Sequence, residues 1–255
     1  MTACVKRFAL IGDPVDHSLS PRMQQAAFDA LELAASYEPR QVGRAALPQA
    51  VERLRNEGFA GWNVTTPLKE NIIPLLDACT PEAKAARSVN TVRYEGGGRY
   101  VGCDTDGAGF IAALRDIWDF EVAGKSVALL GSGPASRAIA GALRAAGAGD
   151  LRCWSRNAET SAAIAPRPDG VADLIVCVLP SGSSISPGAL SCIGRTTRIF
   201  DANYGARRET IPPGVGGARS DGLPLLLHQG ALAFEWWTGR DAPIDAMRSA
   251  LGLRR

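Results

Sequence analysis

A lysine in the stretch Gly61–Glu70 (GWNVTTPLKE) is the first candidate for acid–base chemistry in this chain. Thr66 is a good helix N-cap and Pro67 suits the first helical position, so the pattern predicts Lys69 in the first turn of a helix. A helix N-terminus carries about half a positive charge and favours acidic residues. A lysine that breaks this local rule indicates a functional role. The alternative is a solvated side chain beside Glu70.

Asp106 is the candidate partner of that lysine. It lies in GCDTDGAGF, at the end of a predicted strand and directly before a helical pattern that includes Phe110 and Leu114. A helix N-terminus holds a carboxylate in its ionised form, which suits a group that pairs with a lysine. The alternative is that Thr105 or Asp106 only caps the helix.

Two serines follow the apolar run Arg7–Gly12, which the pattern predicts to be a buried parallel strand. Ser20 can cap a helix that has Pro21 at its first position, and Ser18 lies just before it. Small anions bind where such a strand ends and a helix begins. Capping is an equal alternative for Ser20, whereas Ser18 has no such role in the pattern.

Asn90 stands in the short apolar run SVNTV, which predicts a strand. An asparagine buried in a strand is costly unless its amide is hydrogen-bonded. Either a neighbouring backbone group or a hydroxyl of a ligand could satisfy it, and the sequence leaves both interpretations open.

A glycine-rich turn follows a further predicted strand in Lys125–Gly133 (KSVALLGSG), and a strong helical pattern follows the turn. This is the strand, turn and helix order of a dinucleotide-binding motif, with Ser136 in place of the third glycine. The candidate cofactor-binding residues of this turn are Gly131, Ser132, Gly133, Pro134, Ala135 and Ser136.

The next predicted strand, Leu151–Trp154, ends at Ser155 and Arg156. An arginine at this place pairs with a 2′-phosphate, whereas an acidic residue would accept from a ribose hydroxyl. Arg156 therefore favours NADP as the cofactor, with a solvated surface arginine as the alternative.

The elements that position these groups alternate between strand and helix. Tyr37 lies in a predicted strand, and Leu47–Glu57 forms an amphipathic helical pattern. Because strands and helices alternate throughout, we expect an α/β fold with parallel sheets and no internal repeat.

Four motifs carry a resemblance to a known family. IGDPVDHSLSP, GWNVTTPLKE, SVNTV and GCDTDGAGF, in this order and spacing, resemble the successive motifs of the shikimate dehydrogenase family, which includes quinate/shikimate dehydrogenases. The C-terminal segment DGLPLLLHQGALAFEWWTGRDAP is also similar to that family.

The resemblance implies a role for each matching residue. Lys69 and Asp106 match the catalytic lysine and aspartate. The residues that match substrate-binding positions are Ser18, Ser20 and Thr65 for the carboxylate, Asn90 for the ring hydroxyls, and Tyr204 and Gln229. Ser155, Arg156 and Gly222 join the glycine turn as expected cofactor-binding residues.

The resemblance also implies two domains. We expect residues 1–106, completed by 224–255, to form an α/β substrate-binding and catalytic domain, and residues 107–223 to form a Rossmann-type NADP-binding domain. The implied activity is the reversible, NADP-dependent reduction of 3-dehydroshikimate to shikimate in aromatic amino acid biosynthesis. The alternatives are a quinate/shikimate or aminoshikimate dehydrogenase and, from a different class, a non-catalytic NADP-binding protein.

Three places depart from the family pattern. Only the arginine remains of the Asn-Arg-Thr pattern at Arg156, and the segment Cys177–Ser183 replaces the family's Asn-Ala-Thr-Pro-x-Gly-Met. Asp104 stands before Thr105 where the family has asparagine. These departures bear on cofactor positioning and on substrate specificity.

The bulk composition favours a small molecule as the substrate. The chain has 255 residues, 46% of them hydrophobic, and a net charge of +2, which offers no general attraction for nucleic acid or membranes. The six cysteines are scattered without metal-ligand spacing, so we expect buried thiols in a reducing compartment and no metal site. We expect a cytoplasmic monomer or homodimer.

Overall fold

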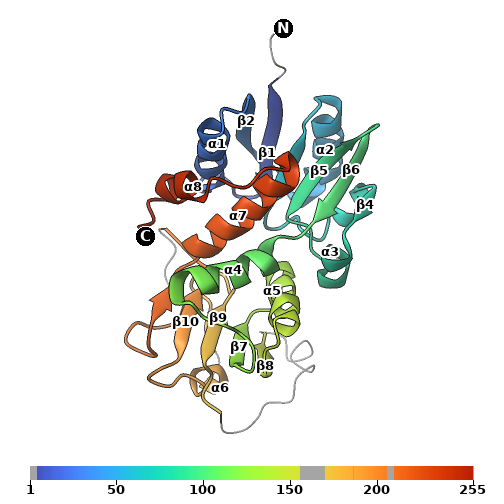
Figure 1. Ribbon diagram of the computed structural model, residues 1–255. Helices are drawn as coiled ribbons and strands as arrows, with labels where there is room; N and C mark the ends of the chain where they lie inside the picture. Colours follow the sequence, from blue (N-terminus) through green and yellow to red (C-terminus); the bar gives the residue numbers. More distant parts are fainter. Residues whose placement is uncertain (1–4, 156–169, 186, 206–209, 255) are drawn as a thin grey trace. The chain divides into compact units, whose positions relative to one another are not determined.

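The computed structural model describes residues 5–155, 170–185, 187–205 and 210–254. The chain divides into two compact units, which are Met1–Gly109 with Leu227–Arg255, and Phe110–Leu226. Figure 1 shows the elements of each unit. The sequence predicts domain boundaries after residues 106 and 223, and these boundaries stay a prediction.

The first unit is built on a mixed sheet of order β2-β1-β3-β5-β6-β4. Its strands are β1 (Lys6–Gly12), β2 (Ala35–Gln41), β3 (Gly61–Val64), β4 (Ala78–Cys79), β5 (Thr91–Gly96) and β6 (Arg99–Cys103). Strand β1 pairs in parallel with β2 and β3, as expected, but β5 runs antiparallel to both β3 and β6. The expected parallel pairing holds for β1, β2 and β3, whereas the turn at Gly97 and Gly98 joins β5 and β6 as a hairpin, and hairpin strands pair antiparallel.

Helices cover this sheet. They are α1 (Ser20–Ala30), α2 (Leu47–Asn56), α3 (Pro81–Ala86), α7 (Leu223–Thr238) and α8 (Ile244–Leu251), with the short 3-10 helices η1 (Arg44–Ala46) and η2 (Ile73–Leu75). Aromatic rings join β1, α1 and α7, with Phe28 packed 5.0 Å from Phe8 and 5.3 Å from Phe234, between ring centroids. Helix α8 lies beside α1 (Figure 1). The C-terminal helices therefore complete the core of the N-terminal unit.

The second unit contains a five-stranded parallel sheet of order β11-β10-β9-β7-β8. Its strands are β7 (Ser126–Leu130), β8 (Asp150–Trp154), β9 (Leu174–Cys177), β10 (Arg198–Asp201) and β11 (Arg219–Ser220), and its helices are α4 (Asp106–Trp118), which begins in the first unit, α5 (Pro134–Ala145) and α6 (Pro187–Leu190). Strand β9 is buried throughout and β7 is buried after its first residue, which is typical of a parallel sheet covered on both faces. This unit has the Rossmann-type arrangement expected from the sequence.

Membrane and metal features are absent from the described ranges. In residues 5–155, 170–185, 187–205 and 210–254, no helix is long and apolar enough to cross a membrane, and no three His, Cys, Asp or Glu side chains gather as metal ligands. The five described cysteines are free thiols. Cys103, Cys177 and Cys192 are buried as expected, whereas Cys79 and Cys153 are only half-buried.

Candidate active site

Strand ends from distant parts of the sequence meet at one edge of the first sheet. Strands β1 and β3 are parallel neighbours, so the segments after them lie together: the backbone N–H of Thr65 donates to the carbonyl of Ile11 at 2.9 Å, and that of Asp13 donates to the carbonyl of Thr66 at 3.0 Å. Thr65 is thereby placed beside the segment that carries Ser18.

The segment after β3 turns instead of forming a helix, so the prediction that Lys69 begins a helix is wrong. Residues 65–72 make turns, and the Thr66–Pro67 peptide is cis. The carbonyl of Lys69 accepts from the backbone N–H of Val89 at 2.9 Å, which ties this segment to the start of β5. Leu68 and Ile72 are fully buried. This tertiary pairing and the burial of both apolar side chains fix the position of Lys69.

The side chain of Lys69 forms a buried ion pair with Asp106. Its Nζ lies 2.5 Å from Oδ2 of Asp106, and the two side chains are 13% and 8% exposed. Asp106 occupies the first position of α4, as the sequence predicts. The pair is thus withdrawn from bulk water, and charges interact more strongly in such a place.

Three electrostatic effects set the protonation of Lys69. Burial lowers the pKa of Lys69, but the charges of Asp106 and Asp104 and the hydrogen bond to Asp106 outweigh it, so the pKa is raised above that of a free lysine. Lys69 is not in a helix, so desolvation, and not a helix N-terminus, lowers its pKa.

Asn90 joins the segments of this site through its amide. Its Nδ2 donates to Oδ1 of Asp106 at 2.8 Å and to Oγ1 of Thr105 at 3.0 Å, and its Oδ1 accepts from the backbone N–H of Thr105 at 2.9 Å. Asn90 is 2% exposed. The protein itself therefore satisfies this buried amide, which was one of the two possibilities left open by the sequence.

A buried hydrogen-bond chain extends from Asn90 across the sheet. Oγ1 of Thr91 donates to Oδ1 of Asn90 at 2.9 Å, Nδ2 of Asn63 donates to Oγ1 of Thr91 at 3.0 Å, and the hydroxyl of Tyr37 donates to Oδ1 of Asn63 at 2.7 Å. Satisfied polar networks of this kind hold buried groups in one arrangement. The chain fixes the orientation of Asn90 and, through it, of Asp106.

Asp104 is a further part of the site, which the sequence marks only as a departure from the family's asparagine. Its Oδ2 accepts from the hydroxyl of Ser88 at 2.5 Å, and its Oδ1 accepts from the backbone N–H of Asp106 at 2.9 Å. Burial and the adjacent charge of Asp106 raise the pKa of Asp104 to about 7, against the lowering effects of Lys69 and both hydrogen bonds. The Asp-Thr-Asp spacing was the available signal, because an aspartate often accepts from the backbone two residues on.

Gln229 reaches this cluster from α7. Oγ1 of Thr105 donates to its backbone carbonyl at 2.9 Å, and Nδ2 of Asn90 lies 3.5 Å from its Oε1. The structure therefore brings Lys69, Asn90, Asp106 and Gln229 together, as the resemblance implies.

Gly109 allows α4 to approach Gln229. A Cβ at Gly109 would lie 2.6 Å from the backbone nitrogen of Gln229 and 2.8 Å from its Cβ. We expect Gly109→Ala to displace Gln229 and to raise KM for the substrate several-fold, with a loss of stability of about 1–3 kcal/mol from overpacking. Steady-state kinetics and urea unfolding measure both effects.

Gly141 provides the matched control for this substitution. It lies in α5, it is exposed, and a Cβ there meets no atom within 4 Å. We expect Gly141→Ala to leave KM unchanged and to stabilise the chain by about 0.5–1 kcal/mol, because alanine favours a helix over glycine. Equal behaviour of the two variants would contradict the close packing at Gly109.

At the start of α1, the side chain of Ser18, and not that of Ser20, accepts a backbone hydrogen bond. Leu19 is the N-cap of α1, and the side chain of Ser20 makes no capping hydrogen bond. Instead Oγ of Ser18 accepts from the backbone N–H of Ser20 at 3.2 Å. Of the two alternatives for Ser20, the structure rules out capping, because the helix begins at Ser20 itself. Ser20 is buried on the α1 face that also bears Gln24, whose Nε2 donates to the carbonyl of Gly230 at 2.8 Å.

The glycine turn leaves backbone exposed at the N-terminus of α5. Gly131 has a φ of 136°, and a Cβ there would lie 2.6 Å from Oγ of Ser136, which is buried in place of the third glycine. Gly133 is the N-cap of α5 without a side-chain cap, and a Cβ there would enter open space. Exposed backbone at a helix N-terminus fits a pyrophosphate group.

The remaining candidates lie beside the second sheet. Of the cofactor candidates, Ser155 follows β8, and Gly222 lies against the backbone of Ala202, where a side chain would not fit. Tyr204, a substrate-binding candidate, follows β10. Arg156 lies outside the described residues. The altered segment after β9 is adjacent to the glycine turn, because a Cβ at Gly131 would lie 3.5 Å from Cβ of Val178.

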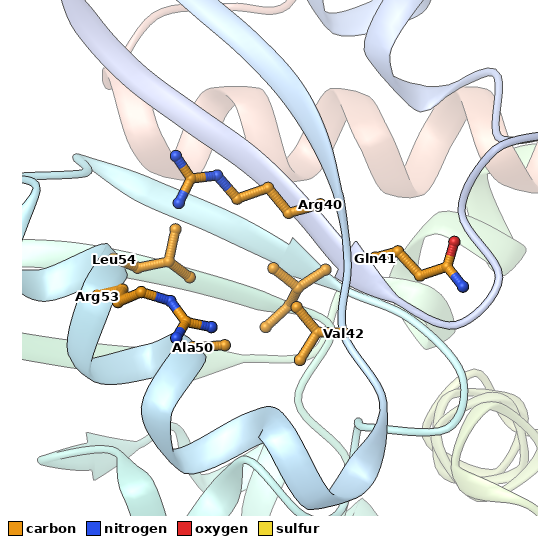
Figure 2. A pocket seen from close by; sticks show the side chains of 7 residues that line it. Arg40, Gln41, Val42, Ala50, Arg53 and Leu54 are labelled. Carbon is orange, nitrogen blue, oxygen red and sulfur yellow. The ribbon is translucent and has the colours of Figure 1, made fainter.

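A separate pocket lies between β1, the end of β2, and α2. Figure 2 shows that Arg40 and Gln41 from β2, and Ala50, Arg53 and Leu54 from α2, contribute to its lining. Arg40 is already paired with Glu57 at 2.7 Å. None of the expected substrate-binding residues lines this pocket, so we assign the chemistry to the Lys69 cluster.

The fold and the site together define a class of protein. A buried lysine–aspartate pair can transfer a proton, and a parallel sheet with a glycine turn can bind a dinucleotide. This combination is typical of nicotinamide-dependent oxidoreductases that act on an alcohol or ketone group.

Comparisons with known proteins identify the family. Residues 10–92 match the family model described as shikimate dehydrogenase substrate binding domain, and residues 222–251 match that of the shikimate 5′-dehydrogenase C-terminal domain. The chain is 35% identical to shikimate dehydrogenase (NADP(+)) of Desulfitobacterium hafniense (strain Y51), with 97% of each chain covered. It is 37% identical to the protein of the same name from Carboxydothermus hydrogenoformans, also with 97% of each chain covered.

Solved structures agree with this assignment. Shikimate 5-dehydrogenase of Thermus thermophilus in complex with shikimate superimposes with a TM-score of 0.84 at 34% identity, covering 97% of this chain and 98% of that chain. The same protein in complex with NADP(H) and shikimate gives a TM-score of 0.83 at 32% identity, with 97% and 99% covered. The chain belongs to the shikimate dehydrogenase family.

Proposed function

We propose that this protein is an NADP-dependent shikimate dehydrogenase that reversibly reduces 3-dehydroshikimate to shikimate. The observation that carries the proposal is the buried ion pair between Lys69 and Asp106, 2.5 Å apart and bonded to Asn90. Its support from relatives is that proteins at 35–37% identity over nearly the whole chain bear that name.

Lys69 supplies the proton in this reaction. As hydride reaches the carbonyl carbon, negative charge develops on the ketone oxygen, and an ammonium group within reach stabilises and then protonates it. In the oxidation of shikimate the neutral amine of Lys69 accepts the hydroxyl proton. Asp106 orients Lys69 and stabilises its charged form, and Asn90 holds Asp106 in place.

The substrate is held by polar groups at the same sheet edge. Ser18, Ser20 and Thr65 bind the carboxylate of shikimate, in keeping with their positions after β1 and β3. Asn90 and Gln229 bind the ring hydroxyls. Their amides contact each other at 3.5 Å, which is a long hydrogen bond, and a hydroxyl of the substrate can replace it. Tyr204 is assigned to the substrate by its match to the family pattern.

NADPH, when bound, supplies the hydride. The turn Gly131–Gly133 and the N-terminus of α5 hold its pyrophosphate through backbone N–H groups, and Ser155 with Arg156 binds the 2′-phosphate end. Gly222 completes the expected set. We also propose that the protein acts in the cytoplasm as a monomer or homodimer, which cell fractionation and sedimentation velocity test.

The two glycines of the turn have different expected roles. A Cβ at Gly133 meets nothing in the protein but would occupy the space of a pyrophosphate, so we expect Gly133→Ala to raise Kd for NADPH at least tenfold, about 1.4 kcal/mol, with normal stability. Gly131→Ala is strained by its positive φ and by Ser136, so it should also lower Tm. Fluorescence titration with NADPH and thermal unfolding distinguish the two. A Gly133→Ala variant with wild-type affinity would contradict this placement of the pyrophosphate.

The experiment that tests the function is the initial rate of NADP reduction with shikimate, compared with quinate and with NAD in parallel. We expect strong activity with shikimate and NADP. Activity only with quinate or an aminated analogue would favour the alternative dehydrogenases, whose possibility rests on Asp104 and the altered segment after β9. NADPH binding without any turnover would favour a non-catalytic binding protein.

A further inference from the structure

Asp104 is a second carboxylate fixed beside the catalytic pair. The hydroxyl of Ser88 donates to one of its oxygens at 2.5 Å, and the backbone N–H of Asp106 donates to the other at 2.9 Å. Ser88 is fully buried. Both oxygens are therefore held in place by donors other than Lys69, and Asp104 acts on the lysine through its charge.

The cluster contains more carboxylates than ammonium groups. Lys69 faces two carboxylates, of which only Asp106 forms the ion pair. Two like charges in a poorly solvated place repel each other, and a lysine near both is the cation that relieves the repulsion. Loss of the lysine proton would leave two adjacent carboxylates without a counter-charge. The arrangement therefore resists deprotonation of Lys69.

We propose that Asp104 is a positioning residue for the proposed reaction, whose negative charge in alkaline solution keeps Lys69 protonated toward higher pH, so that Lys69 remains a proton donor for ketone reduction. This inference rests on the proposed function for its kinetic consequence and on the geometry of Asp104, Ser88 and Asp106 for its physical basis. It assigns a function to the residue at which the chain departs from the asparagine of the family pattern.

Other titratable groups lie near Asp104. Cys103 precedes Asp104. Burial, and to a lesser extent the charge of Asp104, raises the pKa of the Cys103 thiol, so this thiol stays neutral. Glu82 and Arg93 act on Cys103 with opposite signs. On α7, His228 is next to Gln229 in the sequence. Asp104→Asn keeps each of these side chains, and burial remains the larger cause of the raised pKa of Cys103, so a difference between profiles reports Asp104.

Asp104→Asn is the test. Asparagine keeps the shape, can accept from the backbone N–H of Asp106 and can donate to Ser88, but it carries no charge. We expect the alkaline limb of kcat/KM for ketone reduction to move to lower pH, so that at the midpoint of the wild-type limb the variant retains about a tenth of its own plateau rate. Shikimate oxidation, which needs neutral Lys69, should reach its plateau at lower pH.

Two further measurements keep the test decisive. Asp104→Glu retains the charge and should keep the limb at the wild-type pH. The chain has four lysines, Lys6, Lys69, Lys84 and Lys125, so trace acetylation read by mass spectrometry follows the amine of Lys69 against three internal references. Acetylation of Lys69 should begin at lower pH in Asp104→Asn than in the wild type, whether or not shikimate is the substrate.

The outcomes separate the two proposals. Superimposed profiles and equal acetylation in wild type and Asp104→Asn would overturn the role of Asp104. A loss of activity that is uniform across pH, with unchanged acetylation, would overturn it too and would assign Asp104 to structure alone. A wild-type protein inactive with shikimate and NADP, but with the expected acetylation shift, would reject the proposed substrate and retain the inference about Lys69.

Discussion

Replacement of Lys69 by alanine is expected to lower kcat by about 10²–10⁴-fold while KM for shikimate changes little, because general acid–base catalysis contributes rate enhancement of this size. Lys69 acts on the charge that develops on the oxygen, whereas Ser18, Ser20 and Thr65 are assigned to the carboxylate. Steady-state kinetics in both directions measure the split between kcat and KM.

The control for this prediction is Lys84→Ala. Lys84 lies in α3 in the same unit, its side chain is exposed, and it has no place in the Lys69 cluster. Its replacement should leave both constants close to those of the wild type. If Lys69→Ala retained near-normal turnover in a protein shown to be folded by circular dichroism, Lys69 would not be the proton donor.

Replacement of Asp106 by alanine is expected to lower the free energy of unfolding by about 3–5 kcal/mol, because it leaves the ammonium of Lys69 buried without its ion-pair partner. It also removes the acceptor at Oδ1 that Asn90 uses. Urea unfolding at neutral pH measures the loss. A loss below about 1 kcal/mol would show that the pair is solvated and would contradict its burial.

A double variant isolates the ion pair. Lys69→Met with Asp106→Ala removes both charges, and we expect it to be more stable than Asp106→Ala alone, because an apolar side chain needs no counter-charge. The stability difference between wild type and Asp106→Ala should also depend on pH. The raised pKa of Lys69 means that its pairing stabilises the fold fully below the ordinary lysine range and that this stabilisation is lost as pH rises through the folded value. The gap between wild type and Asp106→Ala should therefore narrow at alkaline pH.

Local sequence patterns predicted much of the fold because they depend on local physics. The apolar run before Asp13 forms β1, the amphipathic pattern of Leu47–Asn56 forms α2 with its apolar side chains inward, and the strand, glycine turn and helix around Gly131 are all present. Each of these depends on side-chain periodicity or on glycine conformation within a few residues. They needed no knowledge of distant segments.

The helix start predicted at Lys69 is incorrect because a distant segment competes with local preference. Thr66 and Pro67 predict a helix start, but the carbonyl of Lys69 pairs with the backbone of Val89, and the segment turns instead. At Ser20 the competing interaction is local, because α1 begins at Ser20 and Ser18 accepts its backbone N–H.

By itself the sequence determined the residue types of the site and their family pattern, because the motifs that contain Lys69, Asp106, Asn90 and Gln229 can be recognised without a structure. Only the tertiary structure decided which of these groups touch and how each is charged. Ion pairing and desolvation depend on distances between segments far apart in the chain, and those distances are set by the pairing of β3, β5 and β6 and by the docking of α7. Asp104 shows the difference: a departure from a motif in the sequence became, in the folded chain, a carboxylate clamped beside the catalytic pair.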